Sequence, residues 1–242
     1  MARPLASLIE RAINSVTGLL TSLSSSDQHK AEKLAYWLVD YSNYIEHEEA
    51  FSPKDLIRYK RGQVLKVHFG FNIGNELGGL HYAIVVENNN PLSSGIVTVV
   101  PLTSIKSNKP LTDGRVSLGA EIYNKVFTKS KTCVSAVSER VDALMKALES
   151  TDKTTVSAEY VKQLRSELVA CQADVAYNSR MLDEINKMKT GSIAHVNQIC
   201  AVSKIRIKDP KSQHDVLNGI RISDALMDEI DREIIKIFTK KK

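Results

Sequence analysis

The chain has 242 residues, 43% of them hydrophobic and 25% charged, and a formal net charge of +5, all ordinary values for a globular protein. Its three cysteines lack the spacing of a metal site or a disulfide framework, and no apolar run is long enough to cross a bilayer. Glu10 and Arg11 interrupt the apolar N-terminal pattern, unlike the core of a signal peptide. We therefore expect a cytoplasmic protein that has no structural disulfide and no membrane partner.

Two helices are expected before the first strand. Apolar residues recur at helical spacing over residues 4–22, and again up to about residue 49, where Ser26 or Asp27 can cap the second helix. Pro53 closes this segment, so residues 1–52 are predicted to form an N-terminal helical region.

Three short apolar runs with a period near two follow at residues 64–69, 82–86 and 96–102, and β-branched residues are frequent in them. The glycine-rich loop of residues 70–79 separates the first two, and the turn-forming residues 88–95 separate the others. No segment between them is long enough for a helix, which predicts an antiparallel, barrel-like sheet. A long polar loop on such a sheet is a common place for a binding site.

The second half of the chain predicts a further strand at residues 116–122 and then two helical stripes over residues 133–189, an inserted helical hairpin. Strands at residues 193–202 and 204–207 and a helix at residues 222–238 complete a sheet domain made of residues 58–124 and 190–242. The N-terminal helices and the hairpin each have an apolar face that needs a partner. We expect them to pack on each other beside the barrel, and the alternative is a dimer or partner interface.

Positive charge is concentrated on the predicted sheet. Residues 51–132 carry 11 basic and 5 acidic side chains, whereas residues 1–50 carry 4 and 7. This distribution suits a polyanionic partner such as nucleic acid, although a solvated basic face would look the same.

Several short motifs occur in a characteristic order. Lys60-Arg61-Gly62 precedes the first strand, the loop contains Gly74, Glu76, Gly78 and Gly79, and the third strand ends in PLTS at residues 101–104. The sequence GSIAHVNQ follows at residues 191–198, before the C-terminal helix. No single motif is specific, but their order over residues 58–124 and 190–238 resembles that of the PemK/MazF family of toxins.

This resemblance implies an α+β fold, with a small SH3-like antiparallel β-barrel enlarged by an N-terminal helical pair, an inserted helical hairpin and a C-terminal helix. It implies a toxin–antitoxin endoribonuclease that cleaves single-stranded RNA such as mRNA at a short sequence. The implied reaction is a transesterification without metal or other cofactor that leaves a cyclic phosphate and a 5′-hydroxyl. The implied protein partners are an antitoxin and a second copy in a homodimer.

The same resemblance suggests catalytic residues. Thr103 stands at a catalytic threonine position of the family, whereas His81 replaces a family arginine and His195 stands where some members carry another arginine. Asn197 replaces an aspartate and cannot act as a carboxylate base. We therefore expect Thr103 to hold the scissile phosphate and the two histidines to transfer protons. Without the resemblance, an inert strand-end threonine and inert histidines would be the simpler interpretation.

The candidate RNA-binding residues are polar side chains of the loop and of the strand ends: Lys60, Arg61, Asn72, Asn75, Glu76, Ser104, Asn197 and Gln198. The departures at the catalytic positions leave two other functions open, a catalytically inactive RNA- or partner-binding module and a gyrase-directed toxin on the same fold. The loop lacks the strand–loop–helix context of a nucleotide-binding fingerprint, and no residue cluster has metal-ligand spacing.

Overall fold

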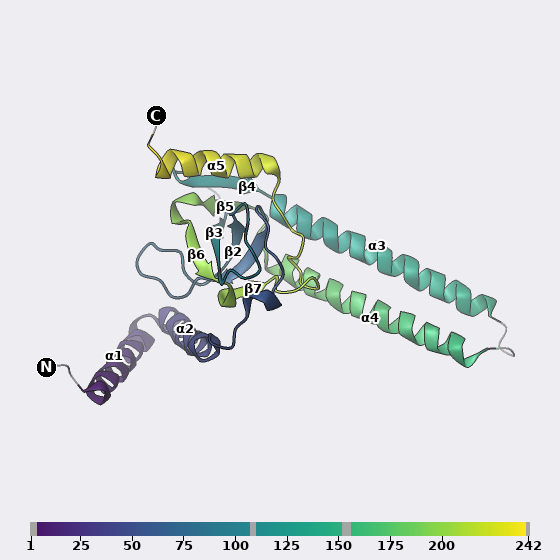
Figure 1. Cartoon of the computed structure of the whole chain (residues 1–242), viewed down its shortest axis with the longest axis horizontal. Coiled ribbons are helices and arrows are strands. Elements are labelled where there is room, and N and C mark those ends of the chain that lie inside the picture. Colours follow the sequence, from purple (N-terminus) through teal and green to yellow (C-terminus); the bar gives the residue numbers. More distant parts are fainter. Residues whose placement is uncertain (1–3, 107–109, 152–155, 241–242) are drawn as a thin grey trace.

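The computed structural model describes residues 4–106, 110–151 and 156–240. These residues form an α+β fold of five α-helices and seven strands (Figure 1), which confirms the predicted class. None of the described helices combines the length and the apolar character needed to span a membrane.

The strands form one antiparallel sheet. They are β1 (Val64–His68), β2 (Leu80–Val85), β3 (Ile96–Ser104), β4 (Arg115–Gly119), β5 (Ser192–His195), β6 (Cys200–Ser203) and β7 (Ile207–Asp209). Their order is β4-β5-β3-β2-β1-β7, and β6 also pairs with β3. The long strand β3 therefore changes partner, pairing with β6 in its first half and with β5 in its second.

The sheet is not a closed barrel, and that detail of the prediction is wrong. The ladders among the described residues end at β4 on one side and at β7 on the other. β7 has only three residues and pairs with β1, while β4 lies beside the helix α5 (Asp224–Phe238). Lys236 of α5 makes an ion pair with Asp113, and Glu233 accepts a hydrogen bond from the backbone N–H of Gly114, so the helix holds the chain that enters β4.

Successive side chains of each strand point to opposite faces of the sheet, and the apolar ones form two separate hydrophobic clusters. Ile84 and Val100 belong to a cluster that also contains residues of α5 and of the long helices, whereas Val85 and Val99 belong to a second cluster with β1, β6 and β7. Burial on both sides of β2 and β3 fixes their register, because a shift by one residue would exchange the two faces.

The inserted hairpin consists of α3 (Glu121–Ser150) and α4 (Ala158–Lys187), which pack against each other and extend away from the sheet (Figure 1). The strand expected at residues 116–122 ends at Gly119, and the helix begins well before residue 133. Ile122 and Val126 explain this difference: at a spacing of four they lie on one side of a helix, and both are buried in the first core cluster.

The N-terminal helices α1 (Leu5–Ser26) and α2 (Gln28–His47) do not pack on the hairpin as expected, since the two pairs lie on different sides of the sheet (Figure 1). α2 docks on the sheet through Trp37, whose ring meets His68 of β1 edge-on at 5.0 Å between centroids. The hairpin is instead anchored by its own buried base, which includes Met181 and Ile185. Amphipathic patterns showed that both pairs need partners, but not which ones.

Candidate active site

Four polar side chains lie on one face of the sheet, on four neighbouring strands. The opposite face of these strands enters the first core cluster through Ile84, Leu102, Val116 and Ala194. Because successive side chains of a strand point to opposite faces, the other face receives His81 of β2, Thr103 of β3, His195 of β5 and Arg115 of β4. Adjacent strands are about 4.8 Å apart, so side chains in such a row can act on one bound group.

Thr103 and His195 are in direct contact. The hydroxyl oxygen of Thr103 lies 2.7 Å from Nε2 of His195, whose side chain is buried at 8% exposure. The other ring nitrogen, Nδ1, has no hydrogen-bond partner in the described residues. An unpaired buried donor costs more than an unpaired acceptor, so the neutral ring should donate from Nε2 to the threonine oxygen. The Thr103 hydroxyl then keeps its own proton for a ligand.

His81 is held by the backbone of the neighbouring strand. Its Nδ1 lies 3.1 Å from the carbonyl oxygen of Leu102 and therefore donates to it, which leaves the lone pair of Nε2 available in the neutral ring. Burial lowers the pKa of His81 and outweighs the carbonyls of Leu102 and Gly78, which favour the charged ring; the nearby ammonium of Lys33 lowers the pKa as well. A neutral imidazole with a free nitrogen can accept a proton at neutral pH.

Arg115 brings a permanent positive charge to the site. It lies directly opposite His195 in the β4–β5 ladder, and its buried Nε has no partner in the described residues. Burial has the largest effect on the pKa of His195 and lowers it. The charges of Arg115 and, to a smaller extent, of His81 lower this pKa further. Arg115 was not predicted as a site residue, because the segment before it has the composition of a polar turn. The alternation of residues 115–118 could have assigned it to the face opposite Val116 and Leu118.

Five of the predicted RNA-contacting residues, three from the loop and two that follow β5, line one groove of about 540 Å³: Asn72, Asn75, Glu76, Asn197 and Gln198. Pro101 also lines it and lies on the same strand face as Thr103, two residues away, so the groove adjoins the row of four side chains.

Two of these amides hold the loop itself. Gln198 accepts a hydrogen bond from the N–H of Leu77 at 2.6 Å and donates one to the carbonyl of Asn75 at 3.0 Å. Asn72 donates to the carbonyl of Leu77 at 2.9 Å. The structure thus gives Gln198 and Asn72 a structural role in this state, beside the ligand-binding role expected from the sequence.

Lys60, Arg61 and Ser104 are not brought to the same place. Arg61 makes an ion pair with Asp231 of α5 and donates to the carbonyl of Val86. Val86 is five residues beyond His81, or roughly 16 Å along an extended strand. Lys60 precedes Arg61 at that far end, and Ser104, next to Thr103, points to the opposite face of β3.

Comparison with family models gives a match over residues 60–171 to the family described as "PemK-like, MazF-like toxin of type II toxin-antitoxin system". This segment belongs to that toxin family. The match confirms the family resemblance for the motifs between residues 60 and 104, while the motif at residues 191–198 lies outside the matched segment. A search of curated proteins found no match. Among solved structures, the crystal structure of MazF (Form-I) from Deinococcus radiodurans is similar, with 10% identity, 75% of this chain and 96% of that chain covered, and a TM-score of 0.35.

The PemK-like segment contains three of the four clustered residues, His81, Thr103 and Arg115, but ends before His195. It begins after the N-terminal helices and continues through α3 into α4. The contact between Thr103 and His195 therefore joins the matched segment to a later part of the chain.

Proposed function

We propose that the chain is a toxin-type endoribonuclease that cleaves single-stranded RNA at a short sequence by transesterification. The observation that supports this proposal is the row of His81, Thr103, His195 and Arg115 on one face of the sheet, two histidines beside an arginine and a hydroxyl. Such a reaction requires a base for the 2′-hydroxyl, donors for the phosphorane and an acid for the leaving oxygen.

His81 is the base in this mechanism. Its Nε2 takes the proton of the 2′-hydroxyl while that oxygen forms a bond to phosphorus. Arg115 stabilises the negative charge that develops on the non-bridging phosphorane oxygens, while the Thr103 hydroxyl donates to the 5′-oxygen and so holds the scissile phosphate. The bond from phosphorus to the 5′-oxygen then breaks, giving a 2′,3′-cyclic phosphate.

His195, in its protonated form, is the acid. Its Nε2 is already bonded to Thr103, so the proton reaches the leaving 5′-oxygen through the hydroxyl of Thr103, which gives up one proton as it receives another. The second product is a 5′-hydroxyl. The two histidines exchange protonation states in the cycle, so the enzyme needs one neutral and one charged at the start.

The rest of the proposal follows the family. An antitoxin would control the enzyme, which would act in the cytoplasm as a homodimer, and no cofactor is proposed. Asn75, Glu76 and Asn197 would contact unstacked bases from the groove next to the catalytic row. Residues 58–124 and 190–242 would form the catalytic domain, with residues 1–52 and 133–189 as additions to it.

A catalytically inactive RNA-binding module is the second candidate. It is favoured by the replacement of a family arginine by His81 and by Asn197, whose amide cannot serve as a base. Both candidates predict salt-sensitive RNA binding.

Purified protein incubated with a mixed RNA pool in EDTA separates them. We expect cleavage at a short recurring site, and losses of roughly 10²-fold or more in His81→Ala and Thr103→Val, as is typical when a proton-transfer group is removed. His214→Ala, which changes an exposed loop histidine, is the matched control and should keep full activity. Intact RNA with tight binding would leave the inactive module, and equal cleavage by all variants would contradict the assignment of the site.

A further inference from the structure

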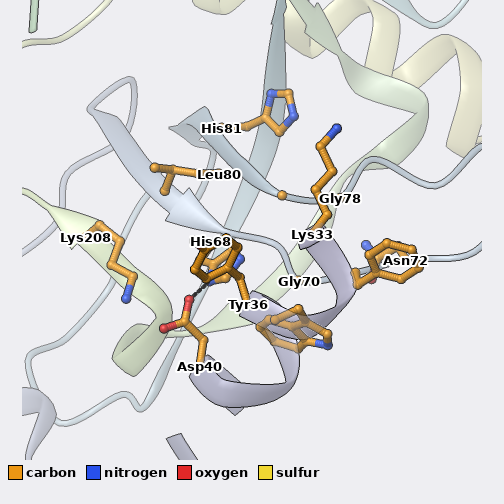
Figure 2. A pocket seen from close by; sticks show the side chains of 13 residues that line it. Lys33, Tyr36, Asp40, His68, Gly70, Asn72, Gly78, Leu80, His81 and Lys208 are labelled. Carbon is orange, nitrogen blue, oxygen red and sulfur yellow. Dashed lines mark ion pairs between the residues drawn. The ribbon is translucent and has the colours of Figure 1, made fainter. Parts of the chain in front are cut away.

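A second groove, of about 620 Å³, lies between α2 and the strands β1 and β2, and His81 is part of its wall (Figure 2). Its volume falls within the range of about 300–1,000 Å³ that is typical of small-ligand sites. The helix that forms the other wall precedes the PemK-like segment, so this groove is made jointly by the toxin fold and the N-terminal addition.

Trp37 is a main contact between the helix α2 and the rest of the protein. Trp37 packs so closely on the loop that a Cβ at Gly70 would lie 2.8 Å from the Trp37 ring. The guanidinium of Arg206 lies 5.4 Å from the centre of the same ring, and Arg206 also donates to the carbonyl of His68 at 2.8 Å. Because His68 of β1, Gly70 of the loop and Arg206, which precedes β7, all contact Trp37, the neighbours of Trp37 in α2 have fixed positions over the groove.

Those neighbours present an aromatic ring and positive charge. Tyr36 lines the groove yet is 75% exposed, so its ring is available to a ligand. Lys33 lies one turn before Trp37 and extends toward Gly78 and His81, while Lys208 stands on the opposite side (Figure 2). Asp40 also lines the groove, but its carboxylate lies 3.1 Å from Nδ1 of His68 and already interacts with the imidazole ring of that residue.

We propose that this groove binds the nucleotide next to the cleaved phosphate, with its base stacked on Tyr36 and its phosphates contacted by Lys33 and Lys208. An aromatic face combined with cations is how proteins hold single-stranded nucleic acid without reading its sequence. The continuity of the groove with His81 favours RNA, since a chain that passes the catalytic row at His81 enters this space next. This inference rests on the proposed ribonuclease function.

The test uses the full chain and an RNA oligonucleotide that contains the recurring cleavage site. Tyr36→Ala should raise KM about ten-fold, as expected from the loss of one base–aromatic stacking interaction, and should change kcat by no more than about two-fold from the wild-type value. Tyr36→Phe keeps the ring and should restore the wild-type KM. Lys33→Gln should reduce the salt dependence of binding by about 0.7 in the log–log slope, as expected for one lost phosphate contact on a single strand. Lys30→Gln, one turn earlier on the exposed part of α2, is the matched control.

Substrates that each lack a single base show which nucleotide stacks on Tyr36. In the wild type, one abasic position beside the cleaved bond should raise KM about ten-fold, and in Tyr36→Ala the same position should have no further effect. If both Tyr36→Ala and Lys33→Gln keep the wild-type KM, the groove is not a nucleotide-binding site, while the proposed ribonuclease function still stands.

The failure of the enzyme proposal would look different. If the wild type binds RNA without cleaving it, the dissociation constants of the same variants test the groove alone. If the wild type neither cleaves nor binds RNA, both proposals are overturned. If these variants keep their RNA affinity but lose affinity for a labelled oligoglutamate peptide, the groove binds acidic protein segments and the RNA assignment is wrong.

Discussion

Gln198 connects the glycine-rich loop to the strand region that carries His195, and its removal should loosen the loop. In Gln198→Leu, the loop loses two hydrogen bonds, to the N–H of Leu77 at 2.6 Å and to the carbonyl of Asn75 at 3.0 Å. Each contributes about 1 kcal/mol net, so local opening of the loop should become about 2 kcal/mol less costly, or about 30-fold more frequent. Leucine is similar in size, so the change removes polarity more than volume.

Amide hydrogen exchange measures this opening directly. We expect the N–H of Leu77 to exchange about 30-fold faster in Gln198→Leu, while the N–H of Ile84 in the core of β2 is unchanged. Gln163→Leu makes the same chemical change on the exposed surface of α4 and should leave both rates as they are. An unchanged exchange rate of the Leu77 N–H would refute the idea that Gln198 holds the loop. Direct contact with RNA, as expected from the sequence, would then be the better explanation of the role of Gln198.

Three further predictions concern pH and stability. Since the pKa values of His81 and His195 are both lowered from 6.5, both limbs of the kcat/KM profile should move toward acid and the optimum should lie below pH 6.5; an optimum above pH 7 would contradict the pairing of base and acid. Burial raises the pKa of Asp209 from 3.8 to about 6, so its ionised form opposes folding above pH 6. Asp209→Asn should therefore increase the free energy of unfolding by up to about 3 kcal/mol at pH 8 and by little at pH 4. Urea titration at the two pH values measures this difference. Arg61→Ala should lower the free energy of unfolding by about 2 kcal/mol through loss of its contacts with Asp231 and Val86, with KM for RNA unchanged; a raised KM at full stability would restore the RNA-binding role.

Much of the sheet could be predicted because its signals are local. Period-two apolar runs gave β1, β2 and β3 within one or two residues, and the order of short motifs led to the toxin family. The same resemblance named His81, Thr103 and His195, of which the last two are in contact although they are 92 residues apart. Their proximity follows from β5 pairing with the end of β3, a long-range pairing that the sequence pattern does not indicate.

The features that were missed depend on contacts between distant segments. Arg115 enters the site only through the β4–β5 register, and Arg61 is bound by Asp231, which lies 170 residues away. The docking of α2 depends on the space that Gly70 leaves for the ring of Trp37, a matter of shape that no hydropathy pattern records. The same limit explains the wrong expectation that the two helical pairs pack together.

The central claim is that the row of His81, Thr103, His195 and Arg115 cleaves RNA through its own 2′-hydroxyl. A single-turnover reaction in EDTA tests it, with an oligonucleotide that contains the recurring site and a copy with one 2′-deoxy substitution at the cleaved position. We expect the all-ribose substrate to yield a 2′,3′-cyclic phosphate and a 5′-hydroxyl, as identified by mass spectrometry, and the deoxy copy to stay intact. Cleavage of the deoxy copy, or products with a 5′-phosphate, would contradict it.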